Sequence, residues 1–188
     1  MKPQLKISLT LAIICAIAAA SLAAVNQVTQ KAIAINSLKE LQDSLKIIYP
    51  IADRFELEEV PDREVSSETE NQDFTIIDQY QVYQGDQKIG KVYRVGSKGY
   101  GGQILLLIAI STQTNTMVGM RVLEHQETPG LGSEITSSHF QEQFQNKPLT
   151  DSFELNRDIQ ALSGATISSR AVIQACQGVL SQLGKEAD

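Results

Sequence analysis

The feature that most constrains this chain is an uncharged apolar run near its N-terminus, from Ile7 to Val25. Its 19 residues include only three mildly polar hydroxyl side chains, those of Ser8, Thr10 and Ser21. Folded as a helix, the run would extend roughly 28 Å, which is close to the thickness of the hydrocarbon core of a bilayer. The sequence therefore predicts a single transmembrane helix over residues 7–25.

The charges around this run predict its orientation in the membrane. Lys2, Lys6 and the amino terminus precede it, which favours a cytoplasmic segment at residues 1–6 and an exported remainder. A secretory signal peptide is the alternative, because small residues such as Ala23 offer a cleavage site. The run is longer than a usual signal core, which favours the retained anchor. Both interpretations place the rest of the chain outside the cytoplasm, on the periplasmic side of the inner or plasma membrane.

Residues 26–73 are predicted to form a helical and acidic connecting region. Apolar residues recur at helical spacing between Thr29 and Ile48, and Pro50 follows them. The stretch from Asp53 to Asp73 then holds nine acidic and two basic residues. We interpret this stretch as a solvated loop or an exposed strand edge, with binding of a cation or a partner as the alternative.

Composition excludes several classes of protein. A chain of 188 residues suffices for one compact domain and an appendage. The net charge of −6, the lack of a Lys/Arg cluster and the absence of Trp argue against a nucleic-acid partner. The two cysteines, Cys15 and Cys176, lie far apart and far from both histidines, which argues against an iron–sulfur cluster or a zinc site. A redox role would therefore require an organic cofactor.

Residues 74–188 have the pattern of one α+β domain. Segments with strand composition follow one another between turn signals: Phe74–Tyr83, Gln87–Val95, Gln103–Ser111 and Thr116–Leu123. This succession predicts a largely antiparallel sheet packed by helices. Helices are expected over Thr136–Phe144 and Thr166–Leu183, with Gly184 as the C-terminal stop of the second.

Two glycine-rich segments are candidate ligand-binding loops. Gly99–Gly102 (GYGG) precedes the most apolar strand, and its glycines permit positive φ and close backbone approach; a tight turn is the alternative. His125–Gly132 (HQETPGLG) contains a Pro-Gly turn, and exposed backbone N–H groups in such a loop suit an anionic or aromatic ligand. His125 and Glu127 invite a general acid–base interpretation, but no nucleophile accompanies them, and an ordinary loop histidine is the alternative.

A third candidate segment, Leu162–Arg170, opens the final helix. Small residues at its entrance leave the first-turn N–H groups uncovered, and these groups together with the helix dipole suit an anion. Ordinary capping of the helix by Ser or Thr is the alternative. The polar side chains available there are those of Ser163, Thr166, Ser168, Ser169 and Arg170. No Gly-Lys-Ser/Thr follows, so a phosphate-loop NTPase is not supported.

Taken together, GYGG, HQETPGLG and SGATISSRAV resemble, in this order and spacing, the G subunit of the Rnf ion-translocating electron-transport complex. More distantly, they resemble the C subunit of the sodium-translocating NADH:quinone reductase. The resemblance implies a membrane anchor followed by an FMN-binding domain at residues 74–188. It further implies one FMN per chain, held by a phosphoester to Thr166, with Ser168 completing the attachment motif and a separate flavin transferase using FAD as donor.

The resemblance also implies which residues surround the flavin and which partners the chain has. The residues expected to line the flavin, besides Thr166, are Ser163, Gly164, Ala165, Ser168, Glu127, Thr128, Gly130, Leu131, Gly132, Tyr100 and Gly101. The expected partners are the other membrane and peripheral subunits of the redox complex, the flavin transferase during maturation, and the bilayer. Neither a catalytic residue nor a metal ligand is implied, and little turnover is expected from the isolated chain.

Two other functions compete with electron transfer on FMN. One is an anchored extracytoplasmic binding or interaction module without a redox role, which would use the same anchor and the same loops. The other is a freestanding flavin reductase, which is disfavoured because no G-x-G-x-x-G follows a strand. Retention of flavin by the denatured chain would separate the first of these from an electron carrier.

Overall fold

The computed structural model describes residues 3–58 and 74–186 of the chain. Most of the acidic stretch predicted over Asp53–Asp73 therefore lies outside the described residues, and Arg54–Glu58 within it form strand β1. The chain divides into two compact units, Met1–Gln42 and Asp43–Asp188. Each unit is described by itself.

The first unit consists of most of helix α1, which runs from Pro3 to Ile48 and ends in the second unit. The helix predicted over residues 29–48 is thus the C-terminal part of a longer helix. Several large apolar side chains of α1 are exposed, among them Ile17 and Leu22. None of the helices in the described part of the chain meets the length and hydropathy required of a membrane-crossing helix.

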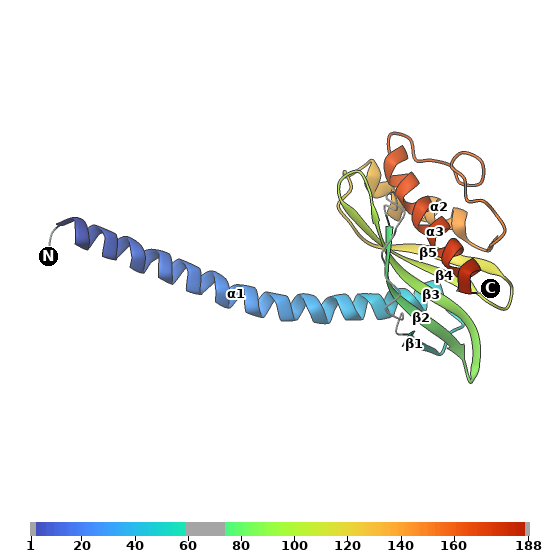
Figure 1. Ribbon diagram of the computed structural model, residues 1–188, viewed down its shortest axis with the longest axis horizontal. Coiled ribbons are helices and arrows are strands. Elements are labelled where there is room, and N and C mark those ends of the chain that lie inside the picture. The colour runs from blue at the N-terminus through green and yellow to red at the C-terminus, as the bar shows by residue number, and fades with distance from the viewer. Residues whose placement is uncertain (1–2, 59–73, 187–188) are drawn as a thin grey trace. The chain divides into compact units, whose positions relative to one another are not determined.

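The second unit is built on one six-stranded sheet in which each strand pairs antiparallel with the next (Figure 1). The strand order along the sheet is the order along the chain, and short turns join the four central strands. The strands are β1 (Arg54–Glu58), β2 (Phe74–Gln84), β3 (Gln87–Lys98), β4 (Gln103–Ser111), β5 (Thr116–His125) and β6 (Lys147–Pro148). The antiparallel sheet predicted from the sequence is therefore confirmed, and β1 and β6 add an edge strand at each side.

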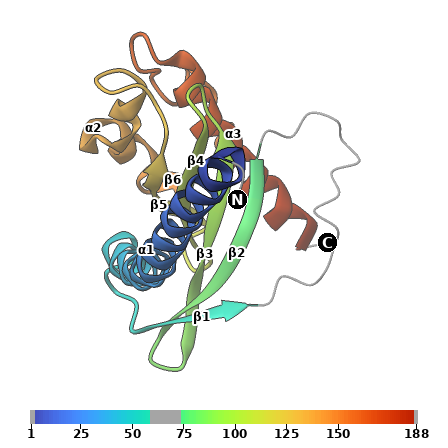
Figure 2. The ribbon, with the colours of Figure 1, turned by 90° about the vertical axis from the view of Figure 1, so that its left-hand side faces the viewer.

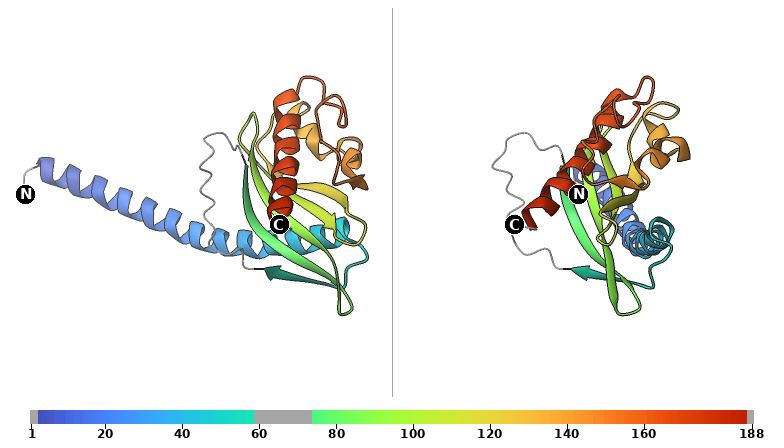
Figure 3. Two further views of the ribbon diagram at one scale, coloured as in Figure 1. Left: turned by 45° about the vertical axis from the view of Figure 1, so that its right-hand side comes forward. Right: turned by 90° about the vertical axis from the view of Figure 1, so that its right-hand side faces the viewer.

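Helix α3 (Thr166–Glu186) covers one face of this sheet, over β2, β3 and β4 (Figure 3). The predicted apolar stripe, which includes Val172, Cys176 and Val179, is buried against alternate residues of β4 such as Leu106 and Ile108. This alternation follows from the pleat of a strand, which points successive side chains to opposite faces. Packing of α3 on these strands forms the core of the unit.

Two helix predictions need correction. Gly184 does not stop α3, which continues to Glu186; a glycine in a helix costs only about 1 kcal/mol relative to alanine, and Leu183 before it still packs on the core. The helix expected over Thr136–Phe144 is divided into η1 (Gly132–Thr136), α2 (Ser138–Gln141) and η2 (Glu142–Phe144). The division falls at Ser137, which is extended and whose hydroxyl accepts the N–H of Phe140 at 3.4 Å.

These short helices carry aromatic side chains into the core. Phe140 and Phe144 are buried, and their rings meet edge to face with centroids 5.5 Å apart. Helix α2 lies beside β5 (Figure 2). The loop that precedes η1 is thereby held near the end of β5, where the candidate site lies.

Candidate functional site

The three segments singled out in the sequence meet at one side chain, that of Glu127. Its Oε1 accepts a hydrogen bond from the N–H of Gly101 at 3.0 Å, which links Glu127 to the GYGG turn between β3 and β4. Its Oε2 accepts a hydrogen bond from the hydroxyl of Ser168, which links Glu127 to the first turn of α3. Only 5% of Glu127 is exposed. Residues far apart in the chain are thus joined through one buried carboxyl group.

The glycines of GYGG are required by close approach. Of the two properties that glycine permits there, positive φ is not used: among the described glycines it occurs at Gly85, Gly130 and Gly164. A Cβ atom on Gly99 would instead clash with Glu127 Oε1, and one on Gly101 would clash with the backbone carbonyl of residue 126. The turn therefore lies directly against the loop that follows β5.

Glycine also shapes the loop of residues 125–132. Gly130 has a φ of +74°, and its N–H donates to Ser133 Oγ at 2.9 Å. A Cβ on Gly132 would lie 2.6 Å from Glu127 Oε2 and 2.8 Å from Ser168 Oγ. The loop can close over the bond between Glu127 and Ser168 because residue 132 has no side chain. Thr128 contributes through its backbone, whose carbonyl accepts the N–H of Leu131 at 3.2 Å.

His125 and Glu127 do not form the acid–base pair that the sequence suggested. The Nδ1 of His125 accepts the backbone N–H of Glu127 at 3.2 Å, which leaves the imidazole proton on Nε2 in the neutral ring. The Glu127 carboxyl group is instead occupied by Gly101 and Ser168. The His125 imidazole and the Glu127 carboxyl group therefore have different hydrogen-bond partners and do not bond to each other.

The N-terminus of α3 presents free donors. The first backbone bond of the helix is from Ser169 N–H to Ala165 O at 3.0 Å. For the N–H groups of Thr166, Ile167 and Ser168, the described part of the chain supplies no hydrogen-bond acceptor. The first turn also carries no acidic residue. An anion placed there would meet three N–H groups and the positive end of the helix dipole.

The nearby hydroxyls do not cap this helix. Ser168 donates to Glu127, and Ser169 Oγ accepts the N–H of Leu162 at 3.1 Å while donating to Ala165 O at 3.0 Å. Thr166 is exposed, and its hydroxyl has no partner among the described residues. Of the two interpretations of this segment, the geometry favours an anion site over ordinary capping.

Each of the three segments also exposes one large apolar side chain. The exposed fraction is 71% for Tyr100, 48% for Leu131 and 53% for Ile167. Gly164 has a φ of +74° and brings the start of the α3 segment next to Leu131, whose Cδ2 would lie 3.2 Å from a Cβ at residue 164. Ser163 and Arg170 are exposed and Ala165 is buried. The site thus offers apolar surface beside an anion-binding helix end.

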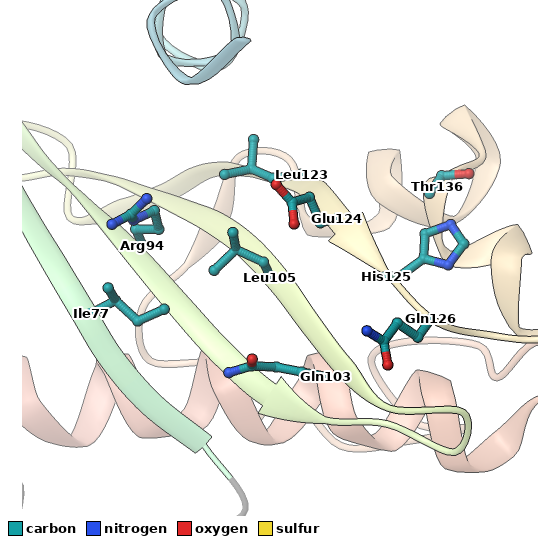
Figure 4. Close-up of a pocket in the computed structure, with 9 residues that line it drawn as sticks. All are labelled: Ile77, Arg94, Gln103, Leu105, Leu123, Glu124, His125, Gln126 and Thr136. Carbon is teal, nitrogen blue, oxygen red and sulfur yellow. The ribbon is translucent and has the colours of Figure 1, made fainter. Parts of the chain in front are cut away.

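A hollow lies beside the second segment, whose His125 helps to line it. About 620 Å³ in volume, it occupies the sheet face opposite α3 (Figure 4). Its floor includes Ile77 and Leu105, and polar side chains such as Arg94, Gln103 and His125 surround them. Thr166 is not among its lining residues. The free N–H groups and the exposed hydroxyl instead favour the N-terminus of α3 as the candidate site.

Sequence reasoning missed this hollow and the central place of Glu127. Residues of four strands, β2 to β5, contribute to the hollow, so no single local pattern marks it. For Glu127, the available signal was an acidic residue between glycine-rich segments, but its partners lie 26 and 41 residues away in the chain. Within the described residues, no group of three potential metal ligands occurs.

The chain is similar to proteins of known family, and the similarity includes the segments of this site. Residues 99–181, which include all three segments, match the family of FMN-binding domains. The chain is 34% identical to the G subunit of the ion-translocating oxidoreductase complex of Methanosarcina acetivorans, over 90% of this chain and 89% of that protein. It is 30% identical to the G subunit of the proton-translocating ferredoxin:NAD(+) oxidoreductase complex of Clostridium ljungdahlii, over 94% and 90%. Among solved structures, NqrC of Shewanella oneidensis matches with a TM-score of 0.49 and 28% identity, over 55% and 54% of the two chains.

Proposed function

Because the chain belongs to the family of G subunits of ion-translocating, Rnf-type oxidoreductase complexes, we propose that it is an electron-transfer subunit that carries electrons on FMN. The observation that carries the proposal is the N-terminus of α3, where free N–H groups, an exposed hydroxyl and apolar side chains lie together. When bound, FMN supplies the redox chemistry, and the protein supplies binding and orientation.

The residues present fit this cofactor. The N–H groups of Thr166, Ile167 and Ser168 suit the phosphate, because they meet an anion at the positive end of the helix dipole. The exposed side chains of Leu131 and Ile167 offer apolar surface to the flavin ring.

We further propose that the flavin is attached covalently, by a phosphoester to Thr166. The exposed, unpartnered hydroxyl and the small neighbours Gly164 and Ala165 support this. With FAD as donor, a bond forms between Thr166 Oγ and the FMN phosphorus, the pyrophosphate bond breaks, and the proton of the hydroxyl goes to the released AMP. Covalent attachment would keep the cofactor from being lost from an exported domain.

The proposal for location rests on the sequence of the N-terminal segment. We propose that residues 1–6 are cytoplasmic, residues 7–25 span the membrane once, residues 26–73 connect, and residues 74–188 bind FMN on the extracytoplasmic side. The 19 residues of the span carry no charge, and a basic segment precedes them. Other subunits of the complex, the bilayer and, during maturation, a flavin transferase would be its partners.

The test is whether the full chain, produced with a flavin transferase, keeps its flavin after denaturation. We expect in-gel fluorescence and an intact mass that exceeds the sequence mass by one FMN less a water. Thr166→Ala should lose both while keeping the fold. Thr150→Ala is the matched control, because Thr150 is also exposed and lies within the matched domain but outside the site. A colourless wild-type chain would instead leave an anchored binding module without a redox role.

A further inference from the structure

Glu127 is a buried acid for which the proposed electron transfer gives no direct use. We infer that Glu127 is a positioning residue: it holds the first turn of α3 against the two glycine-rich loops and so sets the Thr166 hydroxyl for flavin attachment. The inference rests on the proposed function, because it concerns how Thr166 becomes modified. It adds a residue that acts through Ser168 and has no contact of its own with the cofactor.

The carboxyl group of Glu127 is buried beside neutral partners. Glu127 is nearly fully buried, and its two oxygens are held by the N–H of Gly101 and the hydroxyl of Ser168. Among the described residues, no Lys or Arg pairs with it. Burying an acid without a cationic partner costs free energy, and an apolar residue would avoid that cost. Stability alone therefore does not account for a carboxyl group at this place.

The Glu127 carboxyl group is connected to Thr166 through the first turn of α3. The N–H groups of this turn before Ser169 have no backbone acceptor, so side chains add the bonds that join it to the neighbouring segments. Ser169 fixes it to the preceding segment at Leu162, and Ser168 fixes it to Glu127. Ser168 lies two residues after Thr166 in the same turn. The direction of the Thr166 hydroxyl therefore depends on where Glu127 holds Ser168.

Both glycine-rich loops are shaped around this carboxyl group. A Cβ on Gly99 would clash with Oε1, and a Cβ on Gly132 would lie 2.6 Å from Oε2. Glycine at both positions lets the loops close on Glu127 from two sides. Each oxygen accepts a bond from the protein and the side chain is covered, so both oxygens are directed at the protein and away from solvent. Glu127 therefore supports the loops and the first turn of α3 that surround it.

A positioning role and a role for negative charge make opposite predictions for two substitutions. Glu127→Gln keeps the length of the side chain, its oxygen can accept the N–H of Gly101, and its amide can donate to Ser168 Oγ. Glu127→Asp keeps the charge, but it is one methylene shorter and cannot reach both partners. Positioning requires a side chain long enough to bond to both partners, so Glu127→Gln should still accept flavin and Glu127→Asp should not. If the negative charge were what mattered, Glu127→Asp should accept flavin and Glu127→Gln should not.

The experiment measures the rate of FMN attachment to the purified full chain by a flavin transferase with FAD, as a function of chain concentration. We expect Glu127→Gln to stay within about twofold of wild type. The maximal rate should fall by roughly 10- to 100-fold in Glu127→Asp and Glu127→Ala, as for a reacting group displaced by about 1 Å. The concentration of chain at half-maximal rate should change little. Glu134→Ala is the matched control, because Glu134 lies in the next turn but is exposed.

A second measurement covers variants that fold poorly and is independent of attachment. Amide hydrogen exchange of residues 169–172, whose N–H groups bond to the carbonyls at the start of α3, should be faster in flavin-free Glu127→Asp and Glu127→Ala than in wild type and unchanged in Glu127→Gln. Wild-type attachment rates in Glu127→Asp, or loss of attachment in Glu127→Gln, would overturn the inference. Failure of wild type to accept flavin would overturn the proposed function instead, and the exchange data would still decide whether Glu127 positions the turn.

Discussion

The hydroxyl of Ser97 donates a hydrogen bond to the carbonyl oxygen of Ala171 at 2.8 Å, and this bond joins the end of β3 to the second turn of α3. Ser97 is buried, and it immediately precedes the Lys98 that ends the strand before GYGG. The contact therefore fixes α3 on the sheet close to the turn that contacts Glu127. A polar bond within an otherwise apolar interface specifies the position of the helix along the strand.

Ser97→Ala should lower the free energy of unfolding by about 1 kcal/mol, which is typical of one buried intramolecular hydrogen bond. Urea unfolding of the flavin-free chain would measure the loss. Thr150→Ala, which removes an exposed hydroxyl, should change stability by less than about 0.5 kcal/mol. Equal stability of Ser97→Ala and wild type would mean that packing alone fixes α3.

Two glycines of α3 should respond to alanine with opposite signs. A Cβ on Gly178 would clash with the ring of Phe74 on β2, whereas a Cβ on Gly184 meets nothing within 4 Å. Gly178→Ala should destabilise by roughly 1 kcal/mol or more, because overpacking forces the ring or the helix to move. Gly184→Ala should stabilise by about 0.5 kcal/mol, because alanine favours the helix.

The two alanine variants serve as controls for each other, since both remove a glycine from the same helix. Thermal unfolding followed by circular dichroism would compare them under one set of conditions. A rise of both melting temperatures would contradict the packing argument and would assign the effect to helix propensity, whereas a fall of both would contradict the expected gain at Gly184.

Alkaline pH should destabilise the second unit partly through Cys176. Burial raises the pKa of the Cys176 thiol above its ordinary value of 9.0. In the unfolded chain the thiol loses its proton first, so the unfolded state is favoured as pH rises above about 9. Stability from the neutral thiol is thus present below that pH and is lost above it. Burial likewise raises the pKa of Tyr49, which adds to the loss at higher pH.

Cys176→Ala should be less stable than wild type at pH 7, because it leaves a cavity in the core. Between about pH 9 and 10.5, however, it should lose about 1.5 kcal/mol less than wild type does, which is the contribution of one ionising group. Urea unfolding at each pH would measure both quantities. Cys15→Ala, in the other unit, should follow the wild-type curve, and identical pH slopes for wild type and Cys176→Ala would contradict the assignment.

The strands and the final helix could be predicted because each carries its own local pattern. The run Gln103–Ser111 matches β4 at both ends, and the stripe that includes Val172 and Cys176 is the buried face of α3. In contrast, β1 was anticipated only as one of two interpretations of the acidic stretch, an exposed strand edge, because four of its five residues are exposed and it lacks an apolar pattern. The two-residue strand β6 contains Pro148 and pairs only at the edge of β5, so it also lacks a local signal.

The site could be predicted as three segments but not as one arrangement. Glycine and hydroxyl residues marked each segment, and the free first turn of α3 followed from the small residues before it. That Glu127 joins Gly101 to Ser168 depends on contacts between distant parts of the chain. Periodicity and turn chemistry describe neighbours along the chain, so they cannot specify which loops meet in space.

The proposed flavin site makes a last prediction about binding without a covalent bond. Thr166→Val keeps the shape of the side chain and leaves the N–H groups of the first turn free, but it lacks the oxygen needed for the phosphoester. This variant should therefore bind FMN reversibly. It should bind riboflavin at least about tenfold more weakly, because only FMN brings a phosphate to the helix N-terminus.

Quenching of flavin fluorescence on titration with the flavin-free variant would give both dissociation constants. The same titration of flavin-free wild type is the control, and it should give the same ratio, because the attachment oxygen is not needed for reversible binding. Thr166→Ser, which keeps the hydroxyl, should still gain the mass of FMN when produced with the transferase. Equal affinity of Thr166→Val for riboflavin and FMN would mean that the first turn of α3 does not hold the phosphate, and the anion site would then have to be sought elsewhere in the domain.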